Sequence, residues 1–63
     1  MNAQNPIQIL LVEDEDFDVE RVKNTVKLFA SRIRIAEVVS NGKAALELMK
    51  NKPDNYDVVI LDF

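Results

Sequence analysis

The alternation of apolar and polar positions along the chain predicts five elements of secondary structure. Two runs, IQILLV at Ile7–Val12 and VVILD at residues 58–62, are almost entirely aliphatic, which is typical of strands covered on both faces. Between them, RIRIAEVV at residues 32–39 begins with polar and apolar residues in alternation. This pattern predicts a strand with one more exposed face.

The segment after the first strand has the periodicity of an amphipathic helix. Its apolar residues recur at steps of three and four and form one stripe, Val19, Val22, Val26 and Phe29. Charged and amide side chains fill the other side, and acidic residues stand at its beginning, where a helix N-terminus favours negative charge. We expect this stripe, together with Phe17, to belong to the core.

A shorter helix is predicted over residues 43–51. Asn41 and Gly42 before it are turn residues, and Pro53 after it cannot continue a helix. Its inward-facing side chains are expected to be Ala45, Leu48 and Met49. The alternation of strands and helices then predicts an α/β fold, in which a parallel sheet has right-handed crossovers and helices on both faces.

Acidic residues stand where two of the predicted strands end. The first strand runs into Glu13 and Asp14, and the last runs into Asp62. Ligands bind at the carboxyl ends of strands in an open parallel sheet, so neighbouring strands would bring these carboxylates together. Crowded carboxylates repel one another unless a cation neutralises them, and Mg²⁺ prefers such oxygen ligands. A carboxylate beside Mg²⁺ can also accept a phosphoryl group.

These motifs resemble the first half of a response-regulator receiver domain, the phosphoacceptor of two-component signalling. The resemblance rests on ILLVEDE, SNGKAALELM and PDNYDVVILDF in that order, and it covers the chain from Ile7 to Phe63. It implies a flavodoxin-like, doubly wound sheet with strand order 2-1-3 for the part present. It also implies that residues 1–63 are the N-terminal, incomplete half of a single receiver domain.

The resemblance assigns roles to three residues. Asp62 would be the phosphorylated residue, Asp14 a direct Mg²⁺ ligand, and Glu13 a residue that holds the ion mainly through water. The phosphoryl donor would be a sensor histidine kinase in the cytoplasm. The domain would catalyse only its own phosphorylation and dephosphorylation, so it would not be an enzyme acting on other substrates. Receivers often have Asp at the position of Glu13, and Glu is a common alternative.

A complete receiver has elements that the resemblance does not supply here. They hold a Ser or Thr, a Lys and a switch aromatic, and the residue after Phe63 would give the third protein ligand of Mg²⁺. We therefore expect these 63 residues alone not to switch an output. The strand ending at Asp62 would form an apolar, uncovered edge, and such an edge predicts self-association.

The composition of the chain excludes some classes of site and disfavours some classes of partner. The chain has no Cys and no His, which excludes disulfides and Cys/His zinc sites, and its net charge of −3 disfavours nucleic-acid binding through this segment. Its apolar runs are too short to cross a membrane, and its first residues lack the pattern of a signal peptide.

Two alternatives to a receiver remain open. One is a fragment of a Toprim-type, Mg²⁺-dependent nucleic-acid enzyme, which also has a strand ending in Glu; there Gly usually follows the Glu, whereas here Asp14 follows Glu13. The other is a receiver-like dimerisation module that is not phosphorylated. The residue after Phe63 would distinguish the Toprim reading, since Asp at that place favours it.

Overall fold

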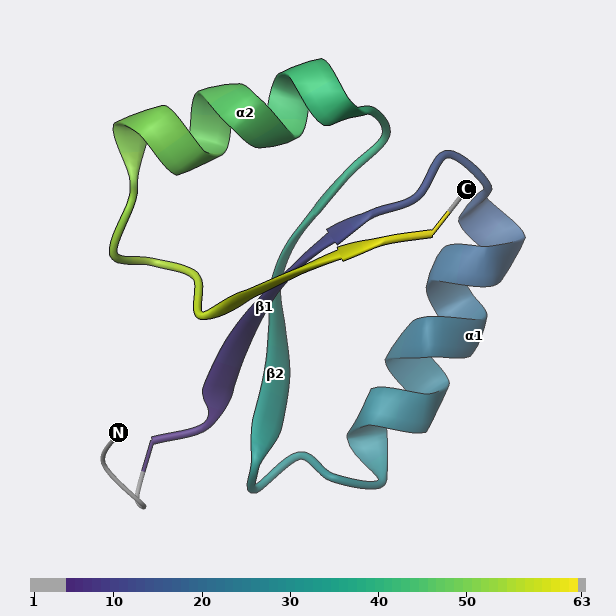
Figure 1. The fold of residues 1–63 in the computed structure, drawn as a ribbon. Helices are drawn as coiled ribbons and strands as arrows, with labels where there is room; N and C mark the ends of the chain where they lie inside the picture. The colour runs from purple at the N-terminus through teal and green to yellow at the C-terminus, as the bar shows by residue number, and fades with distance from the viewer. Residues whose placement is uncertain (1–4, 63) are drawn as a thin grey trace.

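A computed structural model describes residues 5–62 of the chain (Figure 1). The expected domain bounds, 1–63, therefore extend beyond the described residues at both ends. Residues 1–4 and Phe63 lie outside the described part. The described part has three strands and two helices in alternation. They are β1 (Ile7–Val12), α1 (Asp16–Lys27), β2 (Ile33–Val39), α2 (Gly42–Asn51) and β3 (Val58–Leu61).

The three strands form one parallel sheet in the order β2-β1-β3. β1 pairs with β2 from Ile7↔Ile33 to Val12↔Val39, and the register shifts after Ile9. β1 pairs with β3 from Ile9↔Val58 to Val12↔Leu61. The α/β fold, the parallel sheet and the strand order 2-1-3 that the sequence led us to expect are confirmed.

The core lies around β1, which is the central strand of the described part of the chain and has a strand on each side. Leu10, Leu11 and Val12 are fully buried. Side chains alternate across a strand, so Leu10 and Val12 point to one face and Leu11 to the other. Figure 1 shows α1 and α2 on opposite sides of the sheet, which confirms the expectation of helices on both faces.

Helix α2 packs against the face that carries Leu10 and Val12. Ala45 is buried against these two residues, and Val39, Leu48, Met49 and Tyr56 pack around them. The helix begins after Asn41, whose side-chain oxygen accepts a hydrogen bond from the backbone N–H of Ala44 at 2.9 Å. This bond satisfies one of the free N–H groups of the first turn. The predicted helix and its inward-facing residues are confirmed.

Helix α1 covers the opposite face less completely. Val19 is its one buried residue, whereas Phe17 is 78% exposed and Phe29 is 52% exposed. The expectation that both phenylalanines belong to the core was wrong. Phe17 lies about 200° around the helix from Val19 and therefore points away from the sheet. The helix ends at Lys27, and bonds to residues three positions earlier tighten the chain that follows, so Phe29 leaves the stripe.

Strand β3 is held at its beginning by a reciprocal contact with β1. The N–H of Asp57 donates to the carbonyl of Gln8, and the N–H of Gln8 donates to Asp57 Oδ2, both at 2.8 Å. This pair fixes the register of β3. In the described part of the chain, β3 has no neighbouring strand on its far side. Neither of the described helices is long and apolar enough to span a membrane.

Candidate functional site

The carboxyl ends of β1 and β3 lie side by side. Val12 and Leu61 are partners in the sheet, and the N–H of Asp62 donates to the carbonyl of Val12 at 3.0 Å. Glu13 is the residue after Val12, and its own N–H donates to the carbonyl of Val39 at 2.9 Å on the other side. The sheet therefore places the backbones of Glu13 and Asp62 next to each other at one edge. The sequence predicts this proximity if the two strands are neighbours.

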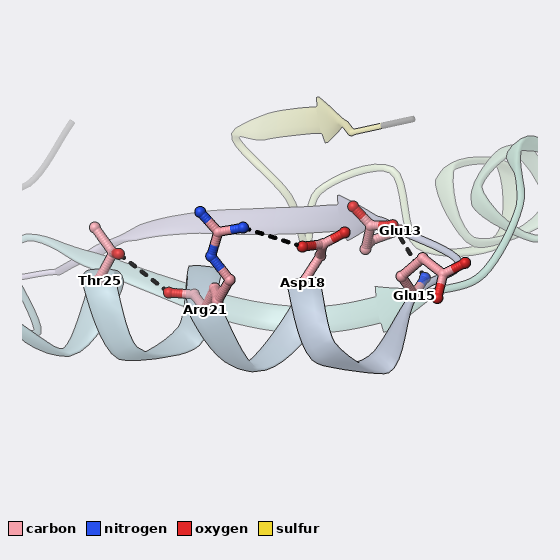
Figure 2. Close-up of polar contacts among 5 residues, drawn as sticks. All are labelled: Glu13, Glu15, Asp18, Arg21 and Thr25. Carbon is pink, nitrogen blue, oxygen red and sulfur yellow. Dashed lines mark hydrogen bonds and ion pairs between the residues drawn. The ribbon is translucent and has the colours of Figure 1, made fainter.

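Glu13 is the buried member of this acidic group. Its residue is only 5% exposed, and its Oε1 accepts a hydrogen bond from the backbone N–H of Glu15 at 3.0 Å (Figure 2). That bond closes the turn between β1 and α1. A buried carboxylate needs such donors because it has lost most of its water.

Opposing influences act on the pKa of Glu13. The hydrogen bond from Glu15 is the largest and lowers this pKa, because it favours the ionised form. Burial, the carboxyl groups of Asp62 and Asp14, and the charge of Asp62 together outweigh it and raise the pKa of Glu13 above its ordinary value of 4.5. Burial and the neighbouring acids therefore disfavour the charged form of Glu13.

The other two predicted site residues are exposed and line different pockets. Asp14 lies beside Glu13 on the wall of a pocket of about 370 Å³ between the start of α1 and the end of β2. Asp62 lines a separate groove on the β3 side. Within residues 5–62, no three acidic side chains are grouped so that all could hold one metal ion. The metal-ligand set Glu13, Asp14 and Asp62 stays a prediction.

The chemistry of these side chains nevertheless suits a hard cation. All the donors are carboxylate oxygens, which Mg²⁺ prefers, and Mg²⁺ usually binds through only one or two carboxylates with water and phosphate as further ligands. The raised pKa of Glu13 comes partly from Asp62 and Asp14. A divalent cation beside Glu13 would offset that repulsion, so the type of donor, a carboxylate oxygen, fits the ion.

The groove that contains Asp62 was not predicted. It has a volume of about 620 Å³ and lies between α1 and β3. Its apolar lining is Val22, Val26 and Ile60, and its polar lining is Asp18, Arg21, Thr25 and Asp62. The sequence pattern put Arg21 on the polar side of α1 and gave no sign that it opens toward a strand end. Only the spacing of positions 18, 21, 22 and 25, which share a helix face, could have suggested it.

Comparison with known proteins adds no relative. No family model matches the chain, and neither a curated protein nor a solved structure matches it. Conclusions about function therefore depend on the residues and their geometry.

Proposed function

We propose that this chain is the N-terminal half of a flavodoxin-like receiver domain and that Asp62 accepts a phosphoryl group. The observation that carries the proposal is the hydrogen bond from Asp62 to Val12, which sets Asp62 beside the buried Glu13 at the carboxyl edge of the sheet. The motifs that resemble receivers lie on the elements that form this edge. The parallel order β2-β1-β3 agrees with the first three strands of that fold.

The proposed reaction needs an accessible carboxylate, and Asp62 has one, since the residue is exposed. A carboxylate oxygen of Asp62 would form a bond to phosphorus. The P–N bond of a phosphohistidine would break, and the released imidazole nitrogen would keep the electron pair and take up a proton. Asp14, Asp62 and Glu13 are the residues that would hold Mg²⁺, and the ion when bound would supply positive charge that neutralises the phosphoryl oxygens.

The proposal implies a partner and a place. The donor is a sensor histidine kinase, and the domain acts in the cytoplasm. The chain promotes its own phosphorylation and dephosphorylation and has no other substrate. Its role is that of a signalling component rather than an enzyme.

Phosphorylation by a small-molecule donor tests the proposal without the kinase. We expect acetyl phosphate or phosphoramidate with Mg²⁺ to add about 80 Da to the wild-type chain, the mass of one phosphoryl group. Asp62→Asn should abolish this adduct. Asp54→Asn is the matched control, because Asp54 is an exposed aspartate in the loop before β3, away from the carboxyl edge. Intact-mass spectrometry at neutral pH measures all three proteins.

The outcomes separate the alternatives. An adduct that is lost only in Asp62→Asn supports the receiver proposal. An adduct that survives Asp62→Asn, or no adduct on the wild type, contradicts it. Mg²⁺-dependent cleavage of nucleic acid by a chain that takes no adduct would favour the Toprim alternative instead.

A second candidate function, a dimerisation module, is favoured by the exposure of β3. Val58 is 45% exposed, Val59 36% and Leu61 62%, although all are aliphatic. β3 carries none of the lysine or proline residues that protect edge strands. We propose that its occupant is β3 of a second copy in antiparallel pairing, because this pairing brings like apolar faces together and closes after two chains. Sedimentation of the purified chain tests this: a monomer at all concentrations would contradict it.

A further inference from the structure

Arg21 lines the same groove as the proposed phosphoacceptor. It is the cationic side chain in that groove, where it accompanies two acids, Asp18 and Asp62. The two lysines of α1, Lys23 and Lys27, lie at a different pocket, which opens toward β2. The groove beside Asp62 therefore has one source of positive charge among the described residues.

The guanidinium of Arg21 is held only weakly. One nitrogen of Arg21 donates to Asp18 Oδ1 at 3.4 Å, and the side chains are 75% and 41% exposed (Figure 2). An exposed ion pair at this distance contributes little, because water competes for both groups. A guanidinium has five N–H donors, and this contact engages one of them. Arg21 is thus free to reach a second anion without losing a strong interaction.

The spacing along α1 and β3 directs these groups to one groove. Asp18, Arg21 and Thr25 are three or four residues apart and share a face of the helix. Ile60 lies in β3, and Asp62 directly follows the strand. Both groups of residues line the groove. An anion carried by the carboxylate of Asp62 would extend into the space that Arg21 borders.

We infer that Arg21 binds the phosphoryl group that is transferred to Asp62. This inference rests on the proposed function and names a residue of this chain that stabilises the transferred group. A phosphoryl group brings additional negative charge to a strand edge that already has Glu13 and Asp62. Arginine binds such oxyanions through two parallel N–H bonds, which a point charge such as lysine cannot reproduce.

The rate of phosphorylation by acetyl phosphate tests this role. In the transfer from this donor, the bond from Asp62 to phosphorus forms as the bond from phosphorus to the acetate oxygen breaks, and acetate leaves with the electron pair. Arg21→Gln should slow adduct formation roughly tenfold at subsaturating donor, and Arg21→Lys should be intermediate. Asp18→Asn should change the rate less than Arg21→Gln does, because the ion pair that it removes is exposed and weak.

Lys23→Gln is the matched control, since it removes the same charge from α1 on the side of a different pocket. Its rate should stay within about twofold of the wild type, as expected for a charge screened by salt. Circular dichroism will show that each variant keeps its helices. Arg21→Lys keeps the positive charge and loses the paired N–H donors, so a rate between those of the wild type and Arg21→Gln identifies binding by the guanidinium, which a merely structural role would not produce.

The results distinguish this inference from the function on which it rests. If Asp62 is phosphorylated and Arg21→Gln reacts as fast as Lys23→Gln, Arg21 has no such role and the receiver proposal stands. If both variants slow equally, the effect is general electrostatics and the inference is overturned as well. If the wild type takes no phosphoryl group, the proposed function fails and the inference fails with it.

Discussion

Strands β1 and β3 have similar sequences and opposite environments. The last four residues of β1 are ILLV, and β3 is VVIL. The β1 residues are buried, three of them fully, whereas Val58 and Leu61 at the two ends of β3 are 45% and 62% exposed. Within residues 5–62, β1 has a strand on each side and β3 has one neighbouring strand, and the two helices lie on opposite sides of the sheet (Figure 1). Position in the sheet, more than residue type, determines how much each aliphatic side chain stabilises the fold.

The same contrast holds for the acids that follow these strands. Glu13 is buried after the central strand, and Asp62 is exposed after the edge strand. One carboxylate therefore accepts a hydrogen bond from a backbone N–H, and the other is open to solvent. This difference separates a carboxylate that is held within the fold from one that a reagent can reach.

The largest expected effect comes from removing one leucine from each strand. Leu10→Ala leaves a cavity against Ala45 and should lower the free energy of unfolding by about 2–5 kcal/mol. Leu61→Ala removes an exposed side chain and should change it by less than about 0.5 kcal/mol. Urea denaturation followed by circular dichroism measures both. Equal losses in the two variants would show that β3 is as well covered as β1.

An intermediate effect is expected on association through β3. Val59→Lys places a charge on the exposed strand and should weaken self-association at least about tenfold, because a charged edge resists pairing. Asn51→Lys adds the same charge at the end of α2 and serves as the control. Sedimentation velocity over a range of concentrations measures the monomer fraction. If Val59→Lys associates as strongly as the wild type, the chains associate through a surface other than β3.

The smallest effect concerns the pH dependence that Glu13 imposes. Its pKa is higher in the folded chain than its ordinary value of 4.5, so folding favours the protonated form. This contribution is fully present below pH 4.5 and is lost as the pH rises through the folded pKa. Glu13→Gln removes the titration, and its stability should therefore improve relative to the wild type as the pH rises.

Urea titrations in metal-free buffer from pH 4 to 7 measure this difference. The same comparison should be repeated with Asp62→Asn present in both proteins. The pH-dependent difference in stability should then be smaller, because Asp62 is one cause of the raised pKa of Glu13. A difference that is constant with pH, or one that moves in favour of the wild type, would contradict the electrostatic link between the two strand ends.

The sequence predicted the secondary-structure elements and their order better than the exposure of individual side chains. Aliphatic runs of strand length and a 3.6-residue repeat are properties of consecutive residues, so the elements and their order could be read directly. The exposure of Phe29 depends on where α1 ends, which the repeat alone does not specify, whereas the exposure of Phe17 follows from its place about 200° around the helix from Val19. Sequence also gave no means to tell that Glu13 is buried while its neighbour Asp14 is exposed.

The candidate site was predictable only in part, for a similar reason. Acids after two strands meet whenever those strands are neighbours, so the proximity of Glu13 and Asp62 followed from the topology. The groove with Arg21 needs the rotation of α1 about its axis relative to β3, and no pattern in the sequence encodes that angle by itself.

A Mg²⁺ titration followed by NMR tests most directly whether the two strand ends form one site. Backbone amide signals of Glu13, Asp14 and Asp62 should shift together along a single binding curve, and Asp62→Asn should weaken that curve. Asp54, in the loop before β3, should not respond. Shifts at Glu13 and Asp14 that leave the Asp62 signal unmoved, or no saturable shift at all, would contradict the shared site.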